Sequence, residues 1–160
     1  MSVQLERDDD RAVERRTDPG EPWSRAERLI HTTARVGVAV VFAYQGLVPK
    51  LLASDLDELS MIGNAGIPLG SVTIAAKALG IAELLLAACL VVFWQDRWPS
   101  RVALALVTAA AIGVSASSPE SLTRAFNPLT LNIALGCLAS IDLIILQRVA
   151  SGRTAAGAAR

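Results

Sequence analysis

The amino-acid sequence predicts an all-α, polytopic membrane protein that is built as a bundle of four transmembrane helices. The first observation is composition: the 160 residues are 52% hydrophobic and 19% charged, with a mean hydropathy of +0.45. Soluble domains average about 25% charged residues. The second observation is that charge gathers in residues 1–28, which hold six arginines and eight acids, and is sparse beyond them. The net charge of zero shows no basic surplus, so the sequence predicts no nucleic-acid partner.

The first predicted span covers about residues 29–50 and follows a polar segment. Residues 1–23 predict a disordered cytoplasmic tail, because they are polar and rich in charge. Ser24 and Glu27 have the spacing of a capping box, in which each side chain accepts a backbone N–H of the first helical turn. We therefore expect the helix to begin in water and to enter the bilayer near Leu29.

The remaining spans follow from hydropathy and from residues that are typical of helix starts. Asn127 and Pro128 suit an N-cap followed by a proline at the first helical position, and Pro99 and Ser100 open the third span in a similar way. A hydrocarbon core needs about 20 apolar residues, and residues 102–118 contain no charge at all. A soluble four-helix bundle would need a polar stripe on every helix, and that segment has none. The other three predicted spans cover about residues 71–94, 101–118 and 128–148, within a transmembrane domain over 24–149 that is followed by a cytoplasmic tail over 150–160.

The distribution of Lys and Arg predicts the orientation of the four spans. The N-terminal segment, the loop between the second and third spans and the C-terminal segment hold eleven of these residues, and the other two loops hold two. Cytoplasmic segments of membrane proteins are enriched in Lys and Arg. We therefore expect a multi-pass protein of the inner (cytoplasmic) membrane with both termini in the cytoplasm.

Two ionisable residues lie inside the predicted spans, close to the cytoplasmic boundary. Arg35 lies six residues inside the first span, and Asp142 lies six residues before Arg148 at the end of the fourth. At helical rise, both side chains sit about 9 Å below the boundary. Ionisable groups in hydrocarbon usually turn inward to a partner. Their equal depth predicts a structural ion pair between Arg35 and Asp142, and His31, one turn before Arg35, is placed to join it.

A second group of polar residues lies nearer the outer side of the predicted bilayer. Glu83 is close to the middle of its span, where a carboxylate is expected to be neutral or paired with a cation. Lys77 does not share its face and is expected to reach toward the interface. The group fits a pocket for a polar head group or a quinone ring, and it fits an interior hydrogen-bond network equally well. The residues predicted for this cofactor-binding pocket are Tyr44, Gln45, Lys77, Glu83 and Asn132, with Lys50 beside them.

The sequence predicts no metal site and no catalytic residue. The single histidine, His31, has no partner at metal-ligand spacing. Cys89 and Cys137 are predicted to differ in depth by about 12–15 Å, which is too far for a disulfide. Phosphate-binding, dinucleotide-binding and serine-hydrolase motifs are absent as well. We therefore expect no self-sufficient enzyme.

Three motifs in order resemble the DoxX-like family of bacterial membrane proteins. Residues 44–50 (YQGLVPK) resemble the end of that family's first helix, 79–83 (LGIAE) its second-helix motif and 126–132 (FNPLTLN) the entry into its fourth helix. The similarity covers about residues 28–148. The long charged N-terminal segment departs from the family's core pattern.

The resemblance implies a four-helix inner-membrane protein that is linked to a membrane oxidoreductase system. Some members of this broad group pass electrons to quinone, so the resemblance suggests an oxidoreductase partner protein and, through it, a quinone. It therefore favours a membrane subunit or anchor of a redox system, and the oligomeric state stays open. The competing interpretation is a small transporter or proton-conducting protein that uses Glu83.

Overall fold

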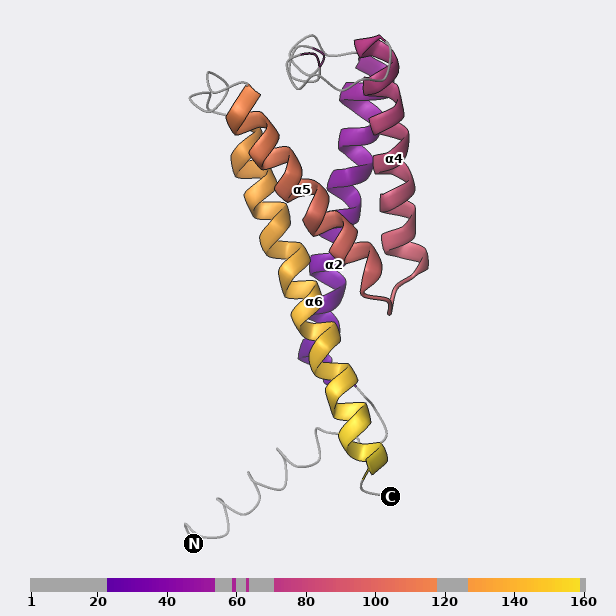
Figure 1. The fold of residues 1–160 in the computed structure, drawn as a ribbon. Helices are drawn as coiled ribbons and strands as arrows, with labels where there is room; N and C mark the ends of the chain where they lie inside the picture. Colours follow the sequence, from indigo (N-terminus) through magenta and orange to yellow (C-terminus); the bar gives the residue numbers. More distant parts are fainter. Residues whose placement is uncertain (1–22, 54–58, 60–62, 64–70, 118–126, 159–160) are drawn as a thin grey trace, which may run out of the picture.

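The computed structural model describes residues 23–53, 59, 63, 71–117 and 127–158, and among these it contains helices and no strand. The tail predicted over residues 1–23 therefore lies almost wholly outside the described residues. The helices run in chain order as shown in Figure 1. They are α2 (Arg25–Gln45), the π-helical segment η1 (Gly46–Ala53), α4 (Val72–Val92), α5 (Trp98–Ser117) and α6 (Pro128–Ala158).

Four helical segments are long and apolar enough to cross a membrane, with mean hydropathies between 1.5 and 2.1. This finding confirms the predicted all-α fold with four transmembrane helices. The segments are Arg25–Ala53, Val72–Val92, Trp98–Ala116 and Pro128–Gly152.

The helix starts use the caps that the sequence indicates. The Ser24 hydroxyl accepts the backbone N–H of Glu27 at 3.2 Å, and the Glu27 carboxylate accepts the N–H of Ser24 at 2.9 Å, so the predicted capping box is present. The Asn127 side chain likewise accepts the N–H of Thr130 at 2.8 Å at the start of α6. These bonds satisfy backbone donors that have no partner inside a helix.

The first membrane-spanning segment changes its helical form near its end, which the sequence analysis did not predict. From Gly46 to Ala53 the backbone is π-helical, and Pro49 lies inside this segment. Proline has no N–H to give to the carbonyl four residues earlier, which here belongs to Gln45. The Lys50 ammonium donates to that carbonyl at 3.5 Å. Pro49 thus interrupts the α-helical hydrogen-bond ladder, and the side chain of Lys50, five residues after Gln45, donates to the Gln45 carbonyl instead.

Helix α6 continues to Ala158, beyond the fourth predicted span and through most of the segment predicted as a tail. The residues after Arg148 are rich in alanine, the strongest helix former, and contain no proline. The alanine content of these residues therefore favours continuation of α6 beyond the end of its apolar segment.

The bundle has two ends with different packing. We call the end where α2 begins and α6 ends the N/C end, and the opposite one the distal end; in Figure 1 the N/C end is lower. Helix α2 packs closely on α4, and α5 on α6. The main core draws on all four helices, but its α5 members, Ala103 and Val107, lie in the half of α5 toward the N/C end. Toward the distal end the two pairs diverge (Figure 1).

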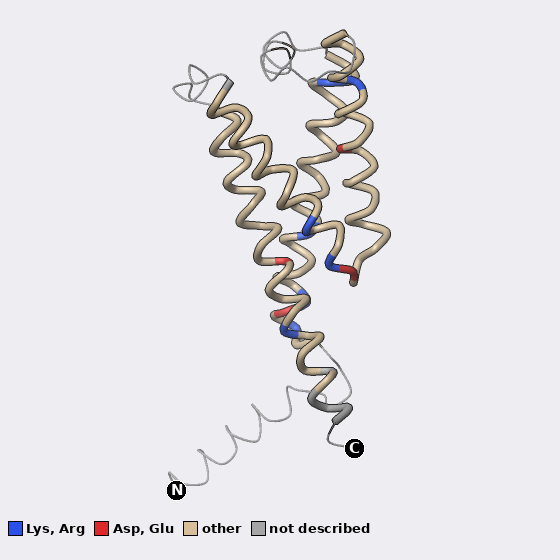
Figure 2. Tube along the Cα trace, viewed as in Figure 1, with Lys and Arg blue, Asp and Glu red and all other residues tan. Residues whose placement is uncertain are grey.

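The described charged residues follow the same division. Figure 2 shows that they gather toward the N/C end and are few toward the distal end. Most of the helix surface is lined by apolar side chains that face outward, since only 22–33% of each membrane-spanning window is buried. This surface suits a lipid bilayer, where apolar side chains need no cover.

Candidate functional site

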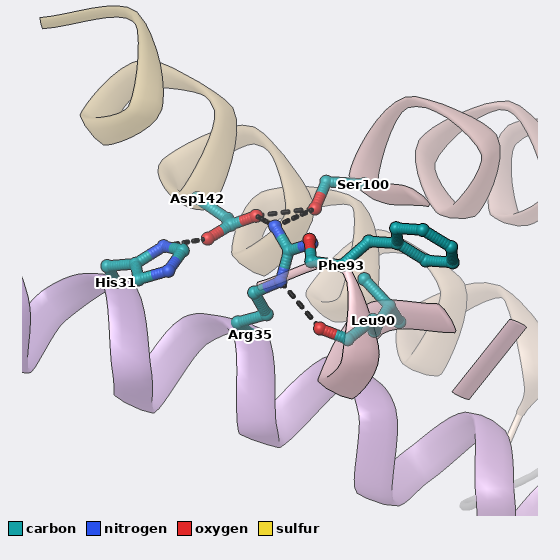
Figure 3. Close-up of polar contacts among 6 residues, drawn as sticks. All are labelled: His31, Arg35, Leu90, Phe93, Ser100 and Asp142. Carbon is teal, nitrogen blue, oxygen red and sulfur yellow. Dashed lines mark hydrogen bonds and ion pairs between the residues drawn. The ribbon is translucent and has the colours of Figure 1, made fainter. Parts of the chain in front are cut away.

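A buried polar cluster near the N/C end joins all four helices (Figure 3). We call it the N/C cluster. Its members come from α2, from the end of α4 and the turn after it, from α5 and from α6. They are the side chains of His31, Arg35, Ser100 and Asp142 and the backbone carbonyls of Leu90 and Phe93.

Asp142 is the acceptor at the centre of this cluster. One carboxylate oxygen pairs with the Arg35 guanidinium at 3.0 Å and also accepts the hydroxyl of Ser100. The other contacts Nδ1 of His31 at 2.5 Å. Arg35, Asp142 and His31 are each at most 1% exposed. The residues predicted to form an ion pair therefore lie in direct contact, and His31 lies with them.

Arg35 also binds the end of α4. Its Nε donates to the carbonyl of Leu90 at 2.7 Å, and a terminal nitrogen donates to the carbonyl of Phe93 at 2.5 Å. Helix α4 ends at Val92, and the last carbonyls of a helix have no intrahelical partner. A cation is also favourable at the negative end of the helix dipole. Arg35 thus caps α4 from the neighbouring helix α2.

The cluster is electrically balanced inside the bundle. The positive charge of Arg35 faces the negative charge of Asp142, and the remaining Arg35 contacts are hydrogen bonds to carbonyls and to the Ser100 hydroxyl. In a low-dielectric interior, a charge that lacks such partners is costly. No sequence pattern pointed to the two carbonyls, since every residue has one, and Ser100 was noted only for its place after Pro99 at the start of the third span.

His31 keeps one ring nitrogen without a hydrogen bond. Because a carboxylate only accepts hydrogen bonds, Nδ1 is the nitrogen that donates to Asp142. Among the described residues, Nε2 is the one buried side-chain nitrogen or oxygen that has no partner. The imidazole packs against the indoles of Trp23 and Trp94, at ring-centroid distances of 4.9 Å and 5.1 Å. The bond to Asp142 and this aromatic packing together hold the ring.

A second ion pair lies toward the distal end, and we call it the distal pair. Lys50 of η1 contacts Glu83 of α4 at 3.0 Å, with exposed fractions of 7% and 21%. Gly46 and Gly80 let the two segments approach closely here. A Cβ on Gly46 would lie 2.5 Å from the carbonyl oxygen of Gly80, which is closer than real Cβ contacts. The glycine crossing thus brings the Lys50 and Glu83 side chains within reach of each other.

The other residues of the predicted pocket do not join the contact between Lys50 and Glu83 through their side chains. Tyr44 is 59% exposed, and Lys77 is exposed as well. Gln45 and Asn132 are half-buried, and Gln45 reaches the distal pair through its backbone carbonyl. The structure therefore joins Glu83 to Lys50 and turns Tyr44 and Lys77 outward. A binding pocket made of all five residues stays a prediction.

The described residues include no group of three or more His, Cys, Asp and Glu side chains that could hold a metal ion. Cys89 and Cys137 are free thiols. The chemistry that the arrangement itself supplies is charge pairing and hydrogen bonding between helices.

Four apolar helices around two interior ion pairs define a small polytopic integral membrane protein. The family model described as "DoxX-like family" matches residues 39–140, which is more than half of the chain. The chain belongs to the DoxX-like family. Comparisons with curated proteins and with solved structures found no match. The matched range contains the distal pair, whereas His31, Arg35 and Asp142 lie outside it.

Proposed function

We propose that this protein is a membrane subunit that anchors a cytoplasmic redox partner to the inner membrane. The observation that carries the proposal is the N/C cluster, which fixes the four helices to one another at the end that the Lys and Arg distribution assigns to the cytoplasm. Arg35 holds the end of α4, and it also contacts Ser100 near the start of α5. Arg35 therefore holds both ends of the short turn between α4 and α5. A turn that is held in this way presents a fixed surface to a partner protein.

In this proposal, the partner protein carries out the redox chemistry and this chain holds it at the membrane. The two interior ion pairs among the described residues are engaged in contacts between helices of this chain. We expect the partner to carry a redox cofactor of its own and to pass electrons to a quinone in the bilayer. The link between DoxX-like proteins and membrane oxidoreductase systems supports this assignment.

Site-specific photo-crosslinking tests the anchor function. A crosslinker at Gln95, exposed in the α4–α5 turn, should capture an oxidoreductase with flavin or iron–sulfur absorbance and quinone reductase activity. The same crosslinker at the exposed, distal Tyr44 is the matched control and should not capture that protein. Equal capture at both positions, or a captured protein without redox activity, would contradict the proposal.

The orientation in the membrane is tested by reporter fusions. A periplasm-active reporter and a cytoplasm-active reporter are fused after Ser60, in the segment before α4, and at Arg160. We expect the cytoplasmic reporter to be active at Arg160 and the periplasmic one at Ser60, because eleven Lys and Arg flank one side of the membrane and two the other. The same compartment for both sites would exclude this topology.

Proton conduction through Glu83 is the second candidate function. The observation that favours it is that Lys50, which forms an ion pair with Glu83, lies within a π-helical segment. Such segments are rare and often occur at functional sites. Glu83 also keeps a 21% exposed side chain, through which a proton could be exchanged.

The variant Glu83→Gln is expected to lower the thermal stability of the protein, because it removes the carboxylate that pairs with the ammonium of Lys50 at 3.0 Å. The loss should be smaller than the about 3–5 kcal/mol typical of a fully buried pair, since Glu83 is partly exposed. The double variant Lys50→Met/Glu83→Gln should recover most of it. A single variant as stable as the parent would show that the distal pair contributes nothing.

Proton flux in proteoliposomes separates the two functions. Flux by the parent protein that is lost in the stable double variant would establish the conducting function and overturn the anchor proposal. Equal flux in empty liposomes and in liposomes with the parent protein favours the anchor.

A further inference from the structure

His31 is a buried titratable residue whose protonation neither proposed function uses. Its side chain is 1% exposed, and one of its two ring nitrogens contacts Asp142 (Figure 3). Because Nδ1 donates to the carboxylate, the protonation of Nε2 decides whether the ring is neutral or a cation. Within the described part of the chain, no hydrogen bond fixes Nε2 in either of these two states.

Two tryptophans pack against this ring and respond to its charge. The ring centroid of His31 lies 4.9 Å from that of Trp23 and 5.1 Å from that of Trp94. The contact with Trp94 is edge-to-face, with an interplanar angle of 79°. A cation within about 6 Å of an indole is attracted by the π electrons of that ring, and a neutral imidazole lacks this attraction. Protonation of Nε2 therefore strengthens the contacts with both indoles.

Charged groups around His31 set the balance between the two states. Those that the described elements bring to the N/C end are Arg25, Glu27, Arg28 and Arg35 of α2, Asp96 and Arg97 of the turn after α4, Arg101 of α5, and Asp142 and Arg148 of α6. Asp142 contacts the ring and favours the cation, whereas burial and the positive charge of Arg35 on the same carboxylate oppose it. Because these influences oppose one another, a change of pH can decide the state of the ring. Histidine is the side chain that ordinarily titrates between about pH 5 and 8.

Trp94 connects the state of His31 to the turn between α4 and α5. Helix α4 ends at Val92 and α5 begins at Trp98, so Trp94 lies within this turn. Arg35 holds the carbonyl of Phe93, and Arg97 donates to the carbonyl of Leu146 at 3.2 Å, whatever the charge of His31. The contact of the Trp94 indole with the imidazole is therefore the contact of this turn that changes when Nε2 gains or loses a proton.

We propose that His31 is a pH-operated switch that controls how firmly the turn between α4 and α5 is held. At low pH the imidazolium is bonded to Asp142 and attracts the indole of Trp94, so the turn is fixed between its two ends. At higher pH Nε2 loses its proton and the attraction is lost. Trp94 then becomes more mobile, while Arg35 keeps the ends of the turn in place. The switch needs no partner protein, so its test is independent of the test of the anchor function.

Nitrogen NMR of the full chain tests the protonation step directly. His31 is the only histidine of the 160 residues, so labelling with nitrogen-15 histidine gives one pair of ring-nitrogen signals, provided that the purification tag contains no histidine. From about pH 5 to pH 9, the Nε2 signal should change from the protonated to the unprotonated form. Nδ1 should stay protonated, because Asp142 accepts its hydrogen bond. An Nε2 signal that keeps one form throughout, or loss of the Nδ1 proton instead, would overturn the proposal.

Fluorescence of single-tryptophan variants tests the coupling to the turn. In Trp23→Phe/Trp98→Phe the remaining indole is Trp94. Its bimolecular quenching constant for acrylamide, which is corrected for the excited-state lifetime, should rise with pH at the midpoint of the Nε2 titration. The matched control Trp23→Phe/Trp94→Phe keeps Trp98, which packs against Phe93 at 5.3 Å, and its constant should not change.

Three outcomes of this measurement would contradict the switch. A quenching constant of Trp94 that does not change with pH would show that the turn is insensitive to the charge of His31. Equal changes for Trp94 and Trp98 would show a general effect of pH on this end of the bundle. A change for Trp94 that persists after His31→Gln would assign the effect to another group.

Discussion

Asp142→Ala is expected to destabilise the protein by about 3–5 kcal/mol, which is the usual cost of removing one partner from a buried ion pair. The substitution leaves the guanidinium of Arg35 without its counter-charge at a site that is 0% exposed. It also removes the acceptor of Ser100 and of His31 Nδ1, so two more buried groups lose their hydrogen bonds. The measurement is thermal unfolding of the detergent-solubilised protein, followed by tryptophan fluorescence.

The charge-swapped variant Arg35→Asp/Asp142→Arg distinguishes the N/C cluster from a simple ion pair. A simple pair would recover most of its stability when the two charges are exchanged. Here, a carboxylate at position 35 would face the carbonyl oxygens of Leu90 and Phe93, which accept hydrogen bonds and offer none. We therefore expect little recovery. Full recovery would show that Arg35 does not hold the end of α4.

The matched control for this series is Asp96→Ala at the same end of the bundle. Asp96 is an exposed acid in the turn after α4, and exposed substitutions of this kind change stability by about 0.5 kcal/mol or less. A loss for Asp142→Ala that is no larger than that of Asp96→Ala would mean that the N/C cluster does not stabilise the bundle.

Gly46→Ala is expected to have the second largest effect, a loss of about 1–3 kcal/mol from overpacking. The new Cβ would lie 2.5 Å from the carbonyl oxygen of Gly80 and 3.1 Å from Cβ of Glu83. The nearest obstacle is backbone, so a side-chain rotation cannot relieve the contact and the two helices must move apart. That separation also draws Lys50 away from Glu83, so the distal pair weakens together with the packing.

Gly113→Ala is the matched control for this prediction. Gly113 lies inside α5, and a Cβ there would meet nothing within 4 Å. Alanine is about 1 kcal/mol more favourable than glycine within a helix, so this variant should be neutral or slightly stabilised. Comparison of the two melting temperatures isolates the cost of close approach. If both variants behave alike, the crossing of Gly46 and Gly80 does not limit the packing.

The two interior ion pairs show how far depth along a helix can predict contacts. Arg35 and Asp142 lie at matching depths with no competing charge beside them in sequence, so depth alone suggested their contact. Glu83 had two lysines within reach of the same half of the bilayer, Lys50 and Lys77. Depth does not distinguish between them, and rotation of the helices about their axes decided that Lys50 is the partner and Lys77 is exposed.

The sequence by itself determined the four membrane-spanning helices and the caps at Ser24 and Asn127. These features depend on neighbours in the chain: hydropathy is a sum over a short window, and a capping side chain bonds to backbone only three residues away. The tertiary structure decided which groups meet across helices, including the carbonyls that Arg35 binds and the glycine crossing that joins Lys50 to Glu83. Such contacts depend on the crossing and rotation of whole helices, which close packing sets through residues distant in sequence.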